Sequence, residues 1–267
     1  MQKILSYTTL FIISSLFVGC GGGSSSNSTP SAVVFNETNY QEAISLLQTV
    51  NRRTYYNYIG ALTIPIDVIA NDNCESGSLR QDGDVYTFES CRYNDALING
   101  SMKILSDAQE RFEAENINLD IQVTPVDTLT TLYHYEGVRF KFTEDAALGD
   151  STLSAYISSG YWKIDNRMAL KYLNFSFDFD INSAIVKHER YFGNFTAYRF
   201  SDAWMTVETL QTIVSVGYCP EEGKLKLKSN GSSLTIRYID DESITVDIDG
   251  EAQTPINNCN DIDEYSL

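Results

Sequence analysis

The sequence predicts an all-β protein, mainly an antiparallel meander, with one N-terminal amphipathic helix near residues 40–51. Apolar and polar residues alternate with period two over most of the chain, which is typical of strands with one buried face. Short turn signals separate these strands, so we expect neighbouring strands to pair in an antiparallel fashion. The apolar faces must be covered, either in a sandwich, by closure into a barrel, or by curling of the sheet around the helix. All three arrangements fit the sequence.

One segment has helical periodicity. Asn39 can cap the helix, and Glu42, three residues later, completes a capping-box pattern. Apolar residues then recur along one helical face at Ala43, Leu46, Leu47 and Val50. We expect this helix to end before Arg52-Arg53 and its apolar stripe to cover one side or one end of the sheet.

The clearest strand lies at residues 173–181. Its apolar positions are Leu173, Phe175, Phe177, Phe179 and Ile181, and its polar positions are Asn174, Ser176, Asp178 and Asp180. The same alternation occurs at residues 117–123, 138–142, 234–238 and 244–248. The turn signals are Asp82-Gly83, Asn99-Gly100, Gly193-Asn194, Asn230-Gly231 and Asp249-Gly250.

Four cysteines follow residue 30, namely Cys74, Cys91, Cys219 and Cys259. An even number in an exported chain indicates two disulfides, for which three connectivities exist. Cys74 and Cys219 each stand just before a glycine that opens a strand, and each is followed by one further cysteine. This repeated pattern favours pairing of Cys74 with Cys91 and of Cys219 with Cys259.

The amino-terminal residues have the pattern of a secretory signal peptide. Lys3 is followed by an apolar stretch that ends at Gly19-Cys20 and resembles the lipobox of bacterial lipoproteins. The resemblance implies cleavage before Cys20 and a lipid, such as palmitate, on its thiol. Gly21 in place of Asp implies the outer membrane rather than the inner one. Residues 20–34 would then be a lipidated cysteine with a flexible Gly/Ser tether, and residues 1–19 would be removed.

The β-rich domain occupies residues 35–267, and a division into two β subdomains stays open. The full chain has 36 acidic and 19 basic side chains, a formal net charge of −17. Nucleic acid and anionic lipid headgroups are poor partners for such a surface, because both attract basic proteins. Membrane attachment is therefore expected to depend on the lipid at Cys20.

The sequence contains no recognisable catalytic, cofactor or metal motif. His188-Glu189 begins like a zinc-protease motif, but Phe192 stands where the second histidine would be, and His134 is isolated in the sequence. Asp178 and Asp180 share one face of a strand and could act as a carboxylate pair in acid–base chemistry, but the pattern favours a solvated acidic face. The 17 tyrosines, with clusters at residues 55–58 and 161–162, are typical either of cross-strand packing or of a binding platform.

These observations predict a non-enzymatic β-rich binding or structural domain, anchored in the bacterial cell envelope, with a glycan or an envelope protein as its partner. Two alternatives stay open. One is an envelope glycan hydrolase that uses paired carboxylates, and the other is a carrier of lipid or lipoprotein in a half-open barrel.

Overall fold

The computed structural model describes residues 33–108, 111–125, 129–145, 148–165, 167–182, 186–197, 200, 203–216, 220–239 and 243–257. Cys20, the tether to residue 32, Cys219 and Cys259 lie outside these ranges. The described helical segments are α1 (Tyr40–Arg53), a π-helical turn η1 (Thr54–Ile59), a 3₁₀ turn η2 (Gly60–Leu62) and α2 (Thr63–Asn71). Among the described residues, no helix is both long and apolar enough to cross a membrane.

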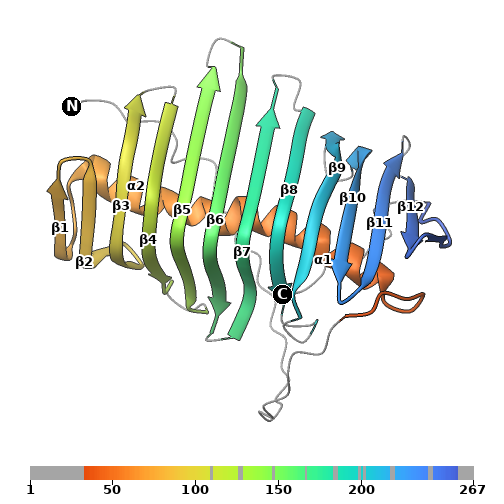
Figure 1. Cartoon of the computed structure of the whole chain (residues 1–267). Coiled ribbons are helices and arrows are strands. Elements are labelled where there is room, and N and C mark those ends of the chain that lie inside the picture. Colours follow the sequence, from red (N-terminus) through yellow and green to blue (C-terminus); the bar gives the residue numbers. More distant parts are fainter. Residues whose placement is uncertain are drawn as a thin grey trace.

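A single antiparallel sheet of 13 strands follows the helices, and its strands are hydrogen-bonded strictly in sequence order. The strands are β1 (Ser76–Asp82), β2 (Val85–Tyr93), β3 (Ala96–Ala108), β4 (Arg111–Val123), β5 (Thr131–Asp145), β6 (Asp150–Ile164), β7 (Arg167–Ile181), β8 (Val186–Ala197), β9 (Met205–Val216), β10 (Pro220–Ser229), β11 (Ser232–Ile239), β12 (Ser243–Ile248) and β13 (Glu251–Ala252). The sheet is not closed, and β1 and β13 are its two edges. The prediction of an all-β meander is confirmed, and the sheet curls around the helix (Figure 1).

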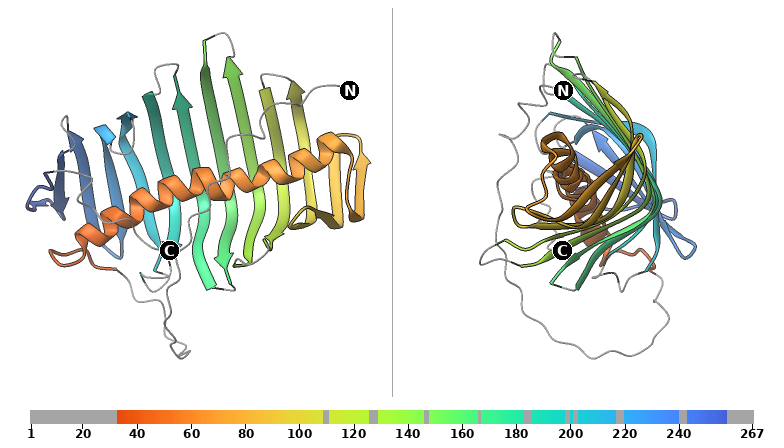
Figure 2. Two further views of the ribbon diagram at one scale, coloured as in Figure 1. Left: turned by 180° about the vertical axis from the view of Figure 1, so that it is seen from behind. Right: turned by 90° about the vertical axis from the view of Figure 1, so that its left-hand side faces the viewer.

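The helical segments join end to end into one rod that crosses the concave face of the sheet (Figure 2). From Tyr40 to Asn71 the rod is about 48 Å long at 1.5 Å per residue, which equals about ten strand spacings of 4.8 Å. Successive parts of the rod contact the strands in reverse order, from β7 to β5 to β2. Thr54 Oγ1 lies 2.9 Å from the hydroxyl of Tyr172 on β7, the hydroxyl of Tyr58 donates to the backbone oxygen of His134 on β5, and α2 contacts β2. The chain therefore crosses the sheet once along the rod and then crosses it in the opposite direction, strand by strand, through the meander.

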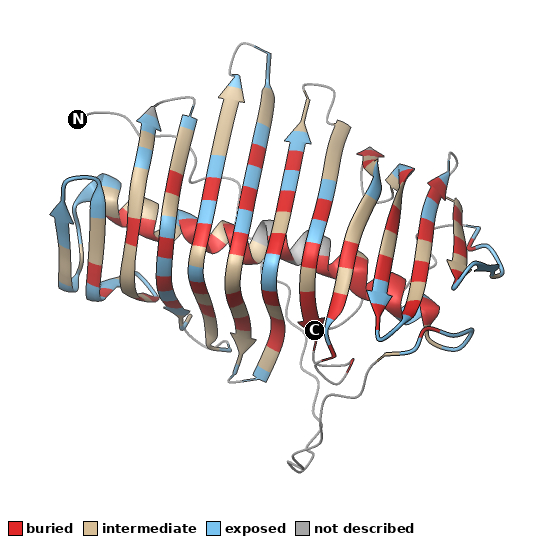
Figure 3. Ribbon diagram, in the orientation of Figure 1, coloured by how far each residue is buried: buried red, intermediate tan, exposed pale blue. Residues whose placement is uncertain are grey.

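The core lies between the rod and the concave face. Helical residues at the predicted spacing are completely buried, and so are the facing residues of the strands, which form red bands across the sheet in Figure 3. At roughly 25 cal/mol per Å² of apolar surface, this burial is the main stabilising contribution to the fold.

The helix begins as predicted, with the backbone N–H of Ala43 bonded to the oxygen of Asn39. The side chain of Asn39, however, accepts a hydrogen bond from the N–H of Asn36, 2.9 Å away in the preceding turn. The predicted end before Arg52-Arg53 is wrong, because α1 includes both arginines and the rod continues to Asn71. Residues 54–60 are poor helix formers, and the concave face stabilises them as a helix by burying Thr54, Tyr58 and Ile59.

The predicted faces of the strands are confirmed with one exception. Phe175, Phe177 and Phe179 are buried, and Asp178 and Asp180 are exposed. Leu173, predicted to be buried with them, is 40% exposed. The cause is a β-bulge at Asn174, whose φ is +49°, because the extra residue shifts the alternation by one position.

Two of the predicted turns are wrong for a related reason. Asn99-Gly100 lies within β3 and Gly193-Asn194 within β8. Both glycines have positive φ, at +112° and +134°, and sit at irregularities of the strands rather than between strands. The other three signals, near Gly83, Gly231 and Gly250, do form turns.

These irregularities form a line across the middle of the sheet. Shifts in register occur in β2, β4, β7, β8 and β10, and positive-φ glycines or asparagines stand beside them. A bulge bends its strand and increases the local twist. A row of bulges therefore gives the sheet the curvature that wraps it around the rod.

Cys74 and Cys91 form a disulfide, with Cα atoms 5.3 Å apart. It joins the segment after α2 to β2, at the end of the sheet where the rod stops. This half of the predicted pairing is confirmed, while Cys219 and Cys259 lie outside the described residues.

Candidate functional site on the convex face

The convex face is the side of the sheet that the rod leaves open (Figure 2). In the middle of this face the register aligns one residue from each of four strands. Tyr156 on β6 lies opposite Ser176 on β7, Ser176 opposite Phe192 on β8, and Phe192 opposite Glu208 on β9. At about 4.8 Å per strand, Tyr156 and Phe192 are about 10 Å apart, with a small serine between them.

Both aromatic side chains are unusually open to water. Phe192 is 58% exposed and Tyr156 is 41% exposed. The hydroxyl of Tyr156 donates to Oδ1 of Asn174 at 2.9 Å, which fixes the position of the ring. Leu173 on β7 and Leu210 on β9 are also exposed, so each of the four strands carries one exposed apolar side chain. Such grouping on otherwise polar strands is typical of a binding surface.

A shallow hollow of about 330 Å³ adjoins this aromatic row. In the register, Asp178 lies opposite Arg190 and Asp180 lies opposite His188. The Nε of Arg190 donates to Oγ1 of Thr212 at 2.9 Å, and this leaves the terminal nitrogens of the guanidinium for a ligand. The hollow is lined by Ser154, Asp178, Asp180, His188, Arg190 and Thr212. We call these six residues, with Tyr156 and Phe192, the convex-face site.

The sheet thus brings together Asp178, Asp180 and His188. The Cα atoms of Asp178 and Asp180 are about 6.7 Å apart along the strand, since a strand rises about 3.3–3.4 Å per residue. Both are exposed on an outward-curving surface. Among the described residues, no group of three or more acidic, histidine or cysteine side chains has the arrangement needed to hold a metal ion. The chemistry that the site offers is hydrogen bonding by charged groups beside exposed rings.

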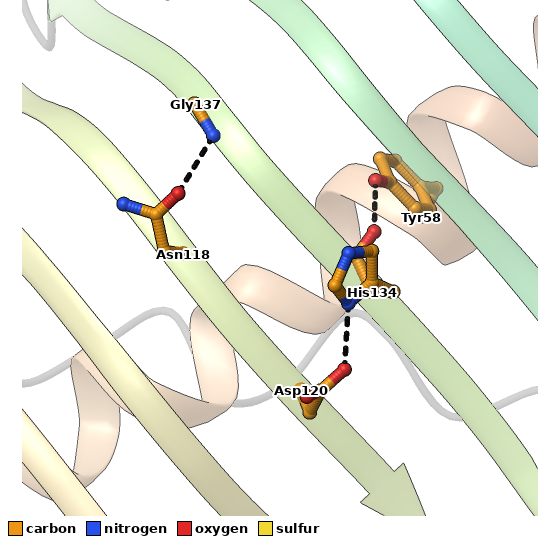
Figure 4. A network of polar contacts seen from close by, with 5 residues as sticks. All are labelled: Tyr58, Asn118, Asp120, His134 and Gly137. Carbon is orange, nitrogen blue, oxygen red and sulfur yellow. Dashed lines mark hydrogen bonds and ion pairs between the residues drawn. The ribbon is translucent and has the colours of Figure 1, made fainter.

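His134 belongs to a different part of the face, on β5. Its Nδ1 lies 2.7 Å from Oδ1 of Asp120 on β4 (Figure 4), and its ring stacks on Tyr161 of β6 with centroids 4.6 Å apart. Lys163 Nζ covers the same tyrosine ring at 4.7 Å. The side chains of this cluster contact one another across three neighbouring strands, so the cluster reads as cross-strand packing. The two histidines are not brought together.

Beneath His134, tyrosines connect the rod to the sheet. The hydroxyl of Tyr58 donates to the backbone oxygen of His134 at 2.6 Å, and that of Tyr135 donates to the backbone oxygen of Tyr58 at 2.5 Å. Burial raises the pKa of both tyrosines well above the ordinary value, so they stay neutral donors. Gly160 leaves the space that Tyr58 occupies, because a Cβ there would meet its hydroxyl. Tyr58, from the cluster at residues 55–58, is therefore a structural residue.

Tyr156, Arg190 and Phe192 were not predicted from the sequence as site residues. A signal for Phe192 was present, because Tyr191 and Phe192 are adjacent and a regular strand cannot bury both side chains. The structure buries Tyr191 and exposes Phe192. The alignment of Phe192 with Tyr156 depends on the register of three strands and has no local signal.

Comparison with known proteins gives no relative. No protein-family model matches the chain, and no curated protein or solved structure is significantly similar to it. The functional argument therefore depends on the convex-face site itself.

Proposed function

We propose that this protein is a non-catalytic binding module of the bacterial cell envelope that binds a glycan on the convex face of β6–β9. The observation that carries the proposal is the row in which Phe192 and Tyr156 are both exposed, two strands apart, next to a hollow lined by charged and hydroxyl groups. An exposed ring offers its flat apolar face, and sugar rings have apolar faces that stack on aromatic side chains. Asp178, Asp180 and Arg190 supply acceptors and donors for the sugar hydroxyls.

A glycan fits this surface better than a protein partner does. A stable protein interface buries about 800 Å² on each side, around a core depleted of charge. Here the exposed apolar side chains are interrupted by Ser176 and Glu208 within the row, and Asp178 and Arg190 lie directly beside it. Each sugar unit of a glycan has both an apolar face and hydroxyl groups. A glycan therefore suits a surface on which aromatic rings and hydrogen-bonding groups are closely mixed.

The same proposal includes the lipid anchor on Cys20 and an outer-membrane location. A tether of about ten Gly- and Ser-rich residues spans roughly 17 Å on average, enough to hold the domain near the membrane without fixing its orientation. Metabolic labelling with a palmitate analogue should mark the protein, and Cys20→Ser should lose both the label and membrane fractionation. Label that persists in the variant would contradict the anchor and leave the glycan proposal untouched.

The hydrolase alternative has one observation in its favour. Asp178 and Asp180 lie on one face of β7 with Cα atoms about 6.7 Å apart, so their side chains can bring the carboxyl groups to the roughly 6.5–9.5 Å separation of inverting glycosidases. Against it, both carboxylates are exposed on a convex surface, which cannot enclose a sugar between them. The carrier alternative would require the rod to leave the concave face, which its side chains now fill.

The proposal is tested by glycan binding, first on an array of bacterial envelope glycans and then by calorimetry with a soluble ligand that the array identifies. Phe192→Ala and Tyr156→Ala should each weaken binding by about tenfold, because an aromatic contact is worth about 0.5–1.5 kcal/mol. Leu105→Ala is the matched control, since Leu105 is 43% exposed on the distant strand β3. Equal weakening by all three variants, or binding that none of them changes, would refute the proposal. Release of shortened glycan by the wild type, lost in Asp178→Asn, would favour the hydrolase instead.

A further inference from the structure

A second hollow lies on the same convex face, at the far ends of β9–β11. Its volume is about 380 Å³. It is lined by Trp204 and Thr206 from the start of β9, by Lys226 and Lys228 of β10, and by the turn from Ser229 to Ser233. Trp204 is 46% exposed, whereas Trp162, the other tryptophan of the chain, is 3% exposed within the core.

This hollow continues the surface of the convex-face site. Thr206 lies opposite both Asn194 and Lys228, and its hydroxyl donates to Oδ1 of Asn194 at 2.7 Å. Asn194 is two residues from Phe192 and therefore on the same face of β8. Trp204 is four residues from the β9 residue that faces Phe192, so the two rings are about 14 Å apart, given a rise of about 3.4 Å per residue and a strand spacing of about 4.8 Å. This distance exceeds the length of one sugar ring.

The polar groups around Trp204 are held in place by the protein. The hydroxyl of Ser229 donates to the backbone oxygen of Trp204 at 3.2 Å, which fixes the backbone beneath the indole. Asp249 accepts hydrogen bonds from the backbone and side chain of Ser233 and from the hydroxyl of Ser232. The hydrogen bond from the Ser233 backbone is the main cause of a lowered pKa of Asp249, which stays charged. The turn that borders the hollow is thereby rigid.

The two lysines differ in how many of their hydrogen-bond donors remain for a ligand. Lys228 Nζ lies 3.3 Å from Oε2 of Glu208 and is committed to that ion pair. Within the described part of the chain, no carboxylate lies within ion-pair distance of Lys226 Nζ, although Asp249 is close enough for the charge of Lys226 to lower its pKa. An ammonium group has three donors and no acceptor. The hollow therefore combines an exposed indole with a lysine that can donate to ligand oxygens.

We propose that the Trp204 hollow is a second subsite of the same glycan-binding surface, and that the ligand is an extended saccharide chain rather than a single sugar. Neighbouring rings of the chain stack on Tyr156 and Phe192, and a ring further along stacks on Trp204 and accepts a hydrogen bond from Lys226. This inference rests on the proposed function. Two linked contacts on one chain give a higher affinity than either alone, because the second contact forms at high effective concentration.

The test compares a disaccharide with a hexasaccharide of the chito-oligosaccharide series, used as soluble probes of glycan length. The hexasaccharide should bind the wild type at least tenfold more tightly than the disaccharide. Trp204→Ala should remove most of this gain and leave disaccharide binding unchanged, whereas Trp204→Tyr, which keeps an aromatic ring, should retain much of it. Lys226→Gln should weaken hexasaccharide binding severalfold. Lys224→Gln is the charge-matched control, since Lys224 is on the same strand face but outside the hollow.

Tryptophan fluorescence gives a direct readout. Acrylamide reaches the exposed Trp204 and not the buried Trp162, so the hexasaccharide should protect the quenchable fraction of the emission and the disaccharide should not. Loss of binding in Phe192→Ala with none in Trp204→Ala and no fluorescence protection would overturn this inference while the proposed function stands. Saccharide binding that neither variant changes, or no saccharide binding at all, would refute both. Loss of hexasaccharide binding in Trp204→Ala but not in Phe192→Ala would also overturn the inference of an extended chain, because that inference requires both Phe192 and Trp204.

Discussion

Replacing Gly193 with alanine tests whether the bulge at which β7 packs closely against β8 requires a glycine. Gly193 has φ of +134°, and a Cβ there would lie 2.3 Å from the backbone oxygen of Asn174 and 2.5 Å from Cα of Phe175. Unfavourable backbone conformations cost about 1–3 kcal/mol, and overpacking adds about 1–3 kcal/mol more. Gly193→Ala should therefore lower the free energy of unfolding by about 2–6 kcal/mol.

Gly250→Ala is the matched control. Gly250 has φ of +92° in the turn after β12, but a Cβ there would meet nothing within 4 Å. It should lose only the conformational part, about 1–3 kcal/mol. Urea titrations analysed by linear extrapolation measure both losses, and an unchanged m value would show that the same surface is exposed on unfolding. Equal losses in the two variants would refute the idea that close packing of β7 against β8 at the bulge requires a glycine.

Three further predictions concern the core, a buried carboxyl group and the cysteines. In urea titrations Phe177→Ala should cost about 3–5 kcal/mol, since Phe177 is fully buried and packs on neighbouring rings, whereas Asp178→Asn should change stability by about 0.5 kcal/mol or less. Burial is the main cause of a raised pKa at Glu189, so the folded state holds this proton to a higher pH than the unfolded chain does. Stability should accordingly fall as the pH rises above the ordinary value of 4.5, and urea midpoints of Glu189→Gln across that range should lack this part of the fall. Non-reducing peptide mapping should join Cys219 to Cys259, and a peptide linking Cys219 to any other cysteine would contradict the pairing.

The sequence predicted the faces of the strands because alternation is a local record of burial. Phe175, Phe177 and Phe179 alternate with polar residues in the sequence, and all three are buried in the structure. The bulges were mistaken for turns because a glycine with positive φ serves both structures, and its neighbours in sequence do not distinguish them. The predicted burial of Leu173 was wrong for the same reason, because the next residue, Asn174, forms a bulge.

The continuation of the rod and the binding surface are non-local features. Thr54 and Tyr58 are helical because Tyr172 and the backbone of β5 bury and bond them, whereas the intrinsic preferences of residues 54–60 do not favour a helix. Tyr156 and Phe192 come together only through the register of β6, β7 and β8. Both features depend on pairings between strands, which alternation alone does not specify.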